Sequence, residues 1–138
     1  VALMLAPNAS AQRGVWAYDV ERSAASVRFS GGSVTVLCDQ GALKIRISTG
    51  RPLNQGSSPT RTVFVSIDQR KFNYDWAFVG RTATLTNPAF VPGLLEAMGS
   101  GSAMTISLAN SGGEMRDYPV RLTRSGEMIS KVRGRCAS

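Results

Sequence analysis

Hydrophobic and polar residues alternate along most of this chain with the period of two residues that is typical of half-buried β-strands. The alternation is clearest in ALKIRIS (42–48), where aliphatic side chains are separated by basic and hydroxyl side chains. Such a strand belongs to an antiparallel sheet with one face in water. The same pattern predicts further strands at 14–20, 26–30, 33–38, 62–68, 72–78, 81–86, 103–108 and 116–122.

Glycine and proline mark the breaks between these segments. Gly31-Gly32 predicts a two-residue hairpin turn, because glycine adopts the positive φ angles that such turns require. Asp39-Gln40-Gly41 predicts a second turn, and the Gly-, Pro- and Ser-rich residues 49–60 predict a surface loop. The segments between residues 62 and 86 therefore read as a β-meander.

Two short segments have helical spacing instead. Asn87-Pro88 predicts a helix N-terminus, and the apolar residues between 90 and 98 recur at helical intervals before Gly99. Ser125 predicts the start of a last turn or two that continues to Val132, with Gly134 releasing the chain. Many short strands with two short helices predict an all-β fold, a mainly antiparallel β-sandwich or barrel-like domain.

The length of 138 residues fits one domain, which we place at 13–138. Residues 1–12, VALMLAPNASAQ, combine an apolar run with the small residues Ala9 and Ala11 in the A-x-A pattern of signal-peptidase sites. We read them as the tail of a secretory signal peptide cleaved near Ala11-Gln12, which predicts a periplasmic protein. The alternative is a retained N-terminal extension that forms an ordinary strand or helix.

The two cysteines, Cys38 and Cys136, are far apart and have no C-x-x-C spacing. In an oxidising compartment such a pair predicts one disulfide bond that ties the end of the chain to an early strand. Without export, two buried free thiols are the better interpretation.

The composition argues against most enzymes. The chain has no histidine, which removes Ser-His-Asp and Cys-His catalysis and histidine-ligated zinc. Asp68 and Asp75 flank a predicted turn and are the best candidates for a carboxylate pair, but nothing indicates the raised pKa that a general acid needs. We therefore predict no catalytic residues, no metal and no cofactor. No stretch approaches the roughly 20 apolar residues that span a bilayer.

The net charge of +7 and the excess of arginine favour binding of planar anions such as carboxylates. Six basic residues, among them Arg121 and Arg124, lie in the last 23 positions and predict a positive surface, unless they only solubilise a charged face. Aromatic residues occupy every second position of FNYDWAF (72–78), next to Arg70 and Lys71. The candidate binding residues are thus Arg70, Lys71, Tyr74, Trp76, Arg121 and Arg124.

The aromatic run has two interpretations. If its aromatic face is exposed, Tyr74, Trp76 and Arg70 can stack on and pair with a sugar such as peptidoglycan. If that face is buried, the four rings are part of the core, as alternating aromatics most often are. The same pattern also suits a single-stranded nucleic acid, which export argues against.

The C-terminal third resembles a known group of proteins. The series LLEAMG, AMTISL, a Gly-Gly turn and YPVRLTRSGEMISKVRGRC, with the earlier VTVLC, ALKIRIS and VFVSID, resembles small exported proteobacterial proteins of the invasion-associated locus B kind and the type VI secretion-associated VasI/TagO family. The resemblance implies a periplasmic β-sandwich that acts by binding. It carries over no catalytic residues.

These observations predict an exported, non-enzymatic protein that engages another cell-envelope protein through a sheet edge or its basic face. A peptidoglycan or anionic-glycan binding module is the first alternative. An inhibitor or immunity protein of an envelope hydrolase or toxin is the second.

Overall fold

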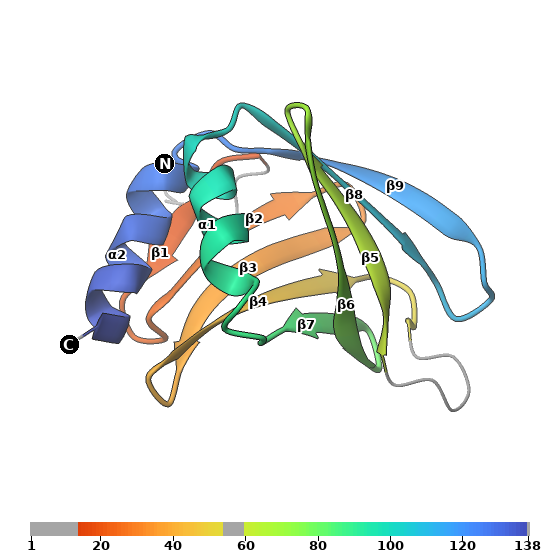
Figure 1. The fold of residues 1–138 in the computed structure, drawn as a ribbon, viewed down its shortest axis with the longest axis horizontal. Coiled ribbons are helices and arrows are strands. Elements are labelled where there is room, and N and C mark those ends of the chain that lie inside the picture. The colour runs from red at the N-terminus through yellow and green to blue at the C-terminus, as the bar shows by residue number, and fades with distance from the viewer. Residues whose placement is uncertain (1–13, 54–59, 138) are drawn as a thin grey trace, which may run out of the picture.

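The computed structural model describes residues 14–53 and 60–137, so the segment read as a signal peptide lies outside the described residues. The described chain forms one nine-stranded antiparallel sheet and two helices (Figure 1). The strands are β1 (Ala17–Asp19), β2 (Ala24–Phe29), β3 (Gly32–Asp39), β4 (Ala42–Thr49), β5 (Thr60–Ile67), β6 (Arg70–Val79), β7 (Thr82–Leu85), β8 (Ala103–Ala109) and β9 (Met115–Arg121); the helices are α1 (Val91–Ser100) and α2 (Ser125–Ala137).

The strand order is β1-β2-β3-β4-β7-β6-β5-β8-β9. Consecutive strands β5, β6 and β7 form the predicted meander, but it enters the sheet in reverse, so that β7 pairs with β4 and β5 pairs with β8. The segment between β4 and β5 therefore crosses to a distant strand position. Alternating hydrophobicity cannot show this, because it marks strands without marking their neighbours.

The sheet curls around the core without closing, and both helices lie at one end of the molecule (Figure 1). One isolated parallel bridge, between Val15 before β1 and Thr123 after β9, links the two outermost parts of the sheet. Helix α2 packs against α1 and against β1, β2 and β3. This architecture confirms the predicted sandwich or barrel-like all-β fold with two helices.

A single cluster of buried side chains runs from Trp16 to Val132 and fills the concave side of the sheet. The alternating residues of the central strands point into it, as Val34 and Val36 do from β3. Helix α1 adds Leu94 and Met98, which are each 1% exposed. The described residues therefore share one core.

The aromatic face of FNYDWAF is buried. Phe72, Trp76 and Phe78 are in the core, whereas Asn73 and Asp75, on the opposite face of β6, are exposed. Tyr74 is half-buried and its ring stacks on that of Phe90, with centroids 4.2 Å apart and an interplanar angle of 6°.

The turns follow the sequence signals with one shift. Phe29 pairs with Gly32, so the first hairpin turn is Ser30-Gly31, not Gly31-Gly32. Gly31 has the positive φ of 105° that this turn needs. Gly32 is the first residue of β3, where a Cβ would collide with the carbonyl group of Ser48.

Both helices differ from the prediction at an end. Asn87 caps a turn, its Oδ1 accepting a hydrogen bond from the Ala89 N–H at 2.9 Å, while α1 itself begins at Val91 with Pro92 in its first turn. Proline is favourable there because the first turn of a helix has no acceptor for its N–H groups. Helix α2 is longer than a turn or two and passes through Gly134.

The predicted disulfide bond is present between Cys38 at the end of β3 and Cys136 at the end of α2, with 5.4 Å between their Cα atoms. It holds the last helical turn against the sheet. Among the described residues, neither helix has the length and apolar character needed to cross a membrane.

Candidate functional site: the groove between β1 and α2

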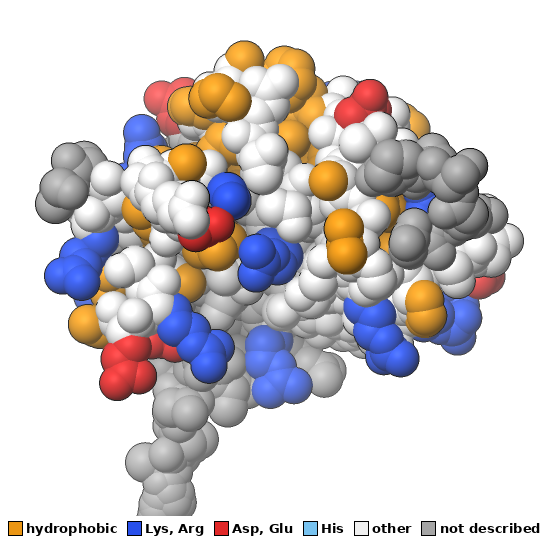
Figure 2. Space-filling view, turned by 90° about the horizontal axis from the view of Figure 1, so that it is seen from below, with side chains coloured by type: hydrophobic (Ala, Val, Ile, Leu, Met, Phe, Trp, Pro, Cys, Tyr) orange, Lys and Arg blue, Asp and Glu red, His pale blue; other side chains and the backbone are white. Residues whose placement is uncertain are grey.

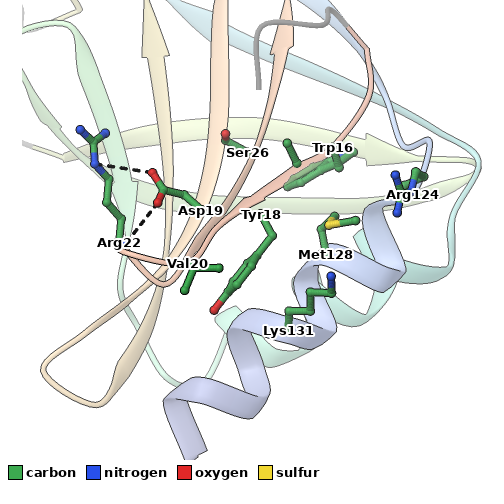
Figure 3. Close-up of a pocket in the computed structure, with 10 residues that line it drawn as sticks. Trp16, Tyr18, Asp19, Val20, Arg22, Ser26, Arg124, Met128 and Lys131 are labelled. Atoms are coloured by element: carbon green, nitrogen blue, oxygen red, sulfur yellow. Dashed lines mark hydrogen bonds and ion pairs between the residues drawn. The ribbon is translucent and has the colours of Figure 1, made fainter. Parts of the chain in front are cut away.

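A groove of about 590 Å³ lies between the first strand and the last helix (Figure 3). Strand β1 and the turn after it form one wall, and α2 with the residue before it forms the other. The groove is lined by Trp16, Ala17, Tyr18, Asp19, Val20, Arg22, Ser26, Arg124, Met128 and Lys131.

Strand β1 is an edge strand, and its backbone faces the groove at Tyr18. Trp16 donates its N–H to the Thr123 carbonyl at 3.1 Å, on the side away from β2. Backbone groups of successive strand residues point to alternate sides, so the N–H and C=O of Tyr18 also point away from β2.

The hydrogen bonds of β2 are consistent with this orientation. The Arg28 carbonyl accepts a hydrogen bond from the Gly14 N–H on the β1 side, so Ala25, which lies opposite Tyr18, directs its backbone groups away from β1. Of the three residues of β1, Tyr18 is thus the one that directs its backbone groups to the side away from β2.

Three side chains line the helix wall of the groove. Met128 and Lys131 of α2 are three residues apart and therefore share one side of the helix, and Arg124, the residue before α2, lines the same groove. Met128 is 5% exposed and closes the floor between the two cations. Methionine adapts its shape to different apolar partners, which suits a surface that accepts a ligand.

Three contacts fix this wall in place. Ser125 Oγ donates a hydrogen bond to the Met98 carbonyl at 2.7 Å. Gly126 lies against Gly99 of α1, and the disulfide bond anchors the other end of α2. The groove thus has a wall that is positioned from both ends of the helix.

The groove carries more positive than negative charge. Arg22 pairs with Asp19 at 3.7 Å on the strand side, and both side chains are largely exposed. Arg124 pairs with Glu127 through its Nε and Nη2 atoms, at 3.0 to 3.2 Å. Within the described part of the chain, Lys131 belongs to none of the ion pairs; its Nζ lies 5.9 Å from the centre of the Tyr18 ring. Lys131 is therefore the groove's uncompensated cation.

Arg124 has an unusual backbone conformation, with a φ of 67°. Residues with a Cβ pay about 1–2 kcal/mol in this left-handed region, where glycine or asparagine is favoured. An exposed ion pair such as that with Glu127 contributes only about 0–1 kcal/mol. Ser23, Gln40 and Asp68 have a similar positive φ outside the candidate site or at turns, so the positive φ of Arg124 does not by itself indicate a function.

Of the six predicted binding residues, only Arg124 lines this groove. Trp76 is 1% exposed, so its prediction as a ligand contact is wrong: its inward-facing parity on β6 places the ring in the core. Tyr74 is covered on one face by Phe90. The exposed Arg70, Lys71 and Arg121 lie on β6 and β9, not on the groove. The sugar-stacking set is therefore not assembled.

The sequence reasoning missed Tyr18, Met128 and Lys131. Two signals were available: Trp16 and Tyr18 share one face of the first predicted strand, and residues 124, 128 and 131 have helical spacing. Neither shows that the first strand and the last helix are neighbours, which is a consequence of the sheet's curvature.

Side chains fill the core of the described part of the chain. A gap of about 10 Å³ lies among apolar side chains that include Trp76, Leu94 and Met104. That volume is at the lower limit for a single water molecule, and water needs several polar partners. The interior of this sheet is packed, unlike that of barrels that carry ligands.

The acidic residues serve structural roles. The Asp68 carboxylate accepts hydrogen bonds from the N–H groups of Ser102 and Ala103, both at 3.2 Å to Oδ1, and so fixes the turn before β8. Asp75 accepts a hydrogen bond from Thr62 at 2.8 Å. Because Thr62 lies six strand residues from Asp68, the two carboxylates are about 20 Å apart, well beyond the separation of glycosidase pairs. They do not form the hypothetical catalytic pair.

Asp39, which lies outside the groove, has a perturbed acidity. Lys44 Nζ donates a hydrogen bond to Asp39 Oδ2 at 2.7 Å, and this bond, with the positive charge of Lys44, lowers the pKa of Asp39. In the described chain no three His, Cys, Asp or Glu side chains come together as a metal site.

No family model, curated protein or solved structure matches this chain. The resemblance to the invasion-associated locus B and VasI/TagO proteins therefore stays a prediction, and the function has to be argued from the groove itself.

Proposed function

We propose that this protein is an exported, non-catalytic binding protein that engages another cell-envelope protein at the β1 edge, inside the groove. The observation that carries this proposal is the backbone of Tyr18, whose N–H and C=O point into an open groove beside α2. An extended segment of a partner can add to such an edge through main-chain hydrogen bonds and place alternate side chains in the groove.

The other end of the sheet is less suited to strand addition. Trp16 Nε1 donates a hydrogen bond to the Arg121 carbonyl of β9 at 3.0 Å, and the Trp16 N–H occupies the carbonyl of Thr123. Pro119 has no N–H to offer a partner strand, and proline is a common means of blocking a sheet edge. Of the two edges, β1 has the groove of about 590 Å³ beside it, whereas Pro119 interrupts the row of N–H donors on β9.

The basic surface does not form a single docking face. Figure 2 shows Lys and Arg side chains scattered over one side of the molecule among polar and hydrophobic atoms. Four basic residues of the described chain, Arg22, Lys44, Arg116 and Arg124, are in ion pairs with acidic side chains. A concave groove beside an edge strand can select its ligand by shape and by hydrogen bonds, which dispersed surface charge cannot do.

Export is part of the proposal. A disulfide bond between distant segments forms and persists in oxidising compartments, which supports a periplasmic location and removal of residues 1–12 near Ala11-Gln12. An inhibitor or immunity protein fits the same surface if the partner is a hydrolase or toxin. The glycan alternative loses its main support with the burial of Trp76.

The test is photo-crosslinking in the envelope of the organism that makes the protein. A photoreactive amino acid replaces Val20, which borders the groove and is 64% exposed, or Val79, which is 70% exposed on β6 away from the groove. We expect one discrete protein adduct from position 20 and none from position 79. Equal adducts from both positions, or none from position 20, would overturn the proposal.

Two further variants test whether the backbone is involved. Tyr18→Pro removes the N–H that points into the groove, whereas Tyr18→Ala removes the same ring but keeps that N–H. We expect the adduct at position 20 to be lost with Tyr18→Pro and kept with Tyr18→Ala. Thermal unfolding of both variants is the control for correct folding. We expect both to fold, because proline is tolerated on edge strands when its nitrogen faces outward.

A further inference from the structure

Strand addition at this edge provides few main-chain hydrogen bonds. Strand β1 has only three residues, and of these only Tyr18 directs its backbone groups away from β2. Most of the affinity and all of the selectivity must therefore come from side chains that enter the groove. The chemistry of its walls then identifies the segment that fits.

We propose that the groove selects an extended segment with two acidic residues at alternating positions, one carboxylate at Lys131 and the other at Arg124. This inference rests on the proposed function, because it names the partner segment for the same site. Its basis is the pairing state of the two cations on the α2 wall, together with their spacing along the groove (Figure 3).

Each cation has donors to offer. Lys131 takes part in no ion pair among the described residues. Its Nζ lies over the ring of Tyr18, and Tyr18 belongs to the wall opposite α2. In Arg124, Glu127 engages Nε and Nη2, which leaves Nη1 for a further acceptor. An arginine can hold a carboxylate through this planar fork, and a lysine through three rotatable donors.

The spacing of the two cations is somewhat larger than that of alternate side chains in an extended peptide. Arg124 directly precedes α2, and Lys131 lies seven residues further along the chain, which corresponds to about 10 Å along a helix axis. Side chains two residues apart on one face of a strand are about 7 Å apart. The flexible Arg124 and Lys131 side chains can close that difference, and Met128 between them contacts the aliphatic part of the acidic residues.

The polarity of the groove also sets where the acids go. Asp19 lies at the strand end of the groove and already pairs with Arg22. A carboxylate placed there meets a cation that already has a partner, whereas one placed at Lys131 meets a cation with no ion pair among the described residues. At Arg124, which is also paired, a carboxylate has the remaining Nη1 donor. The protein's net charge of +7 adds long-range attraction for an acidic partner.

Fluorescence anisotropy with labelled peptides tests this inference on the purified protein. The first peptide has eight residues with β-branched side chains and Glu at two alternating positions, and the second replaces both Glu residues by Gln. A third has the two Glu residues adjacent, so that they project to opposite faces. We expect the first to bind at least about tenfold more tightly than each of the others, since each well-formed charged contact is commonly worth that factor.

Matched variants locate the binding on the α2 wall. Lys131→Glu and Arg133→Glu change the net charge equally, but only Lys131 lines the groove. We expect Lys131→Glu to weaken the first peptide by about a hundredfold, and Arg133→Glu to have only the small effect of net charge. Arg124→Asn removes the second cation while suiting the left-handed backbone, and should weaken binding by about tenfold.

Each outcome decides between the two proposals. Equal binding of the Glu and Gln peptides, with loss in Tyr18→Pro, keeps strand addition and overturns the acidic preference. Equal weakening by Lys131→Glu and Arg133→Glu, or no acidic peptide binding at millimolar concentration, also overturns it. Binding of a soluble muramyl peptide in place of the acidic peptide assigns the groove to a glycan and overturns both. A C-terminally amidated copy of the first peptide must bind as tightly as the free acid, because the inference places side-chain carboxylates in the groove.

Discussion

Gly126 of α2 lies so close to Gly99 of α1 that a Cβ on Gly126 would come within 2.6 Å of the Gly99 carbonyl oxygen. This contact between two helix backbones sets the position of α2, and therefore the width of the groove that α2 forms with β1. Two glycines far apart in the sequence thus determine the geometry of the candidate site.

Gly126→Ala should therefore destabilise the protein, although alanine is the better helix former. The added methyl group meets backbone atoms that cannot rotate away, and such overpacking costs about 1–3 kcal/mol. Gly93→Ala is the matched control, because a Cβ on Gly93 of α1 meets no atom within 4 Å. Urea unfolding should show a lower midpoint for Gly126→Ala and an equal or higher midpoint for Gly93→Ala. A neutral Gly126→Ala would show that the helices separate easily.

The backbone of Arg124 predicts a difference between two substitutions. Arg124→Gly and Arg124→Ala both remove the pair with Glu127, but only glycine relieves the φ of 67°. Arg124→Gly should be about 1 kcal/mol more stable than Arg124→Ala. Thermal unfolding of the two proteins measures this difference. Identical stabilities would mean that the residue does not keep this conformation in solution.

Loss of the disulfide bond should be costly and should act on the groove. It joins residues 98 positions apart, and removal of such a link typically costs about 2–5 kcal/mol. The Cys38→Ser/Cys136→Ser double variant should unfold at a correspondingly lower urea concentration. Hydrogen exchange should increase first in the last turns of α2, because these lose their anchor to β3. Uniformly faster exchange across the sheet would contradict a local role for the bond.

The Asp39–Lys44 pair predicts a small dependence of stability on pH. The lowered pKa of Asp39 means that the folded state favours its carboxylate form, so the contribution is present above the unfolded value of about 4 and disappears as the pH falls through the folded pKa. A double-mutant cycle with Asp39→Asn and Lys44→Met, followed by urea unfolding, should give a coupling energy at pH 6 that vanishes at lower pH. Because the pair is exposed, 1 M salt should also reduce it. A coupling that grows on acidification would contradict this assignment.

The local structure was largely predictable from the sequence. The strands follow from alternation, and Gln40-Gly41 forms its hairpin turn with φ angles of 54° and 82° as the glycine indicates. The disulfide bond between Cys38 and Cys136 could be predicted because the chain has only these two cysteines, provided that they are oxidised. Helix ends were predicted less well: Asn87-Pro88 indicated the start of the first helix, whereas α1 begins at Val91, and α2 continues through Gly134.

The candidate site was much less predictable. We considered FNYDWAF as a binding site because four of its seven residues are aromatic. The alternation of aromatic and other residues is the same whether the aromatic face of the strand is buried or exposed. The covering of Trp76 depends on β4, β5, β8 and α1, whose side chains surround it. No local signal shows that the two walls of the groove meet, since Tyr18 and Lys131 are more than a hundred residues apart.

The sequence by itself determined what each segment forms: the strands, their turns, the two helices and the disulfide, because these depend on neighbouring residues and on side-chain chemistry. The tertiary structure alone decided the reversed insertion of β5, β6 and β7, the burial of Trp76 and the meeting of β1 with α2. These depend on which distant surfaces bury one another, and the curling of the sheet brings its first strand and the last helix together.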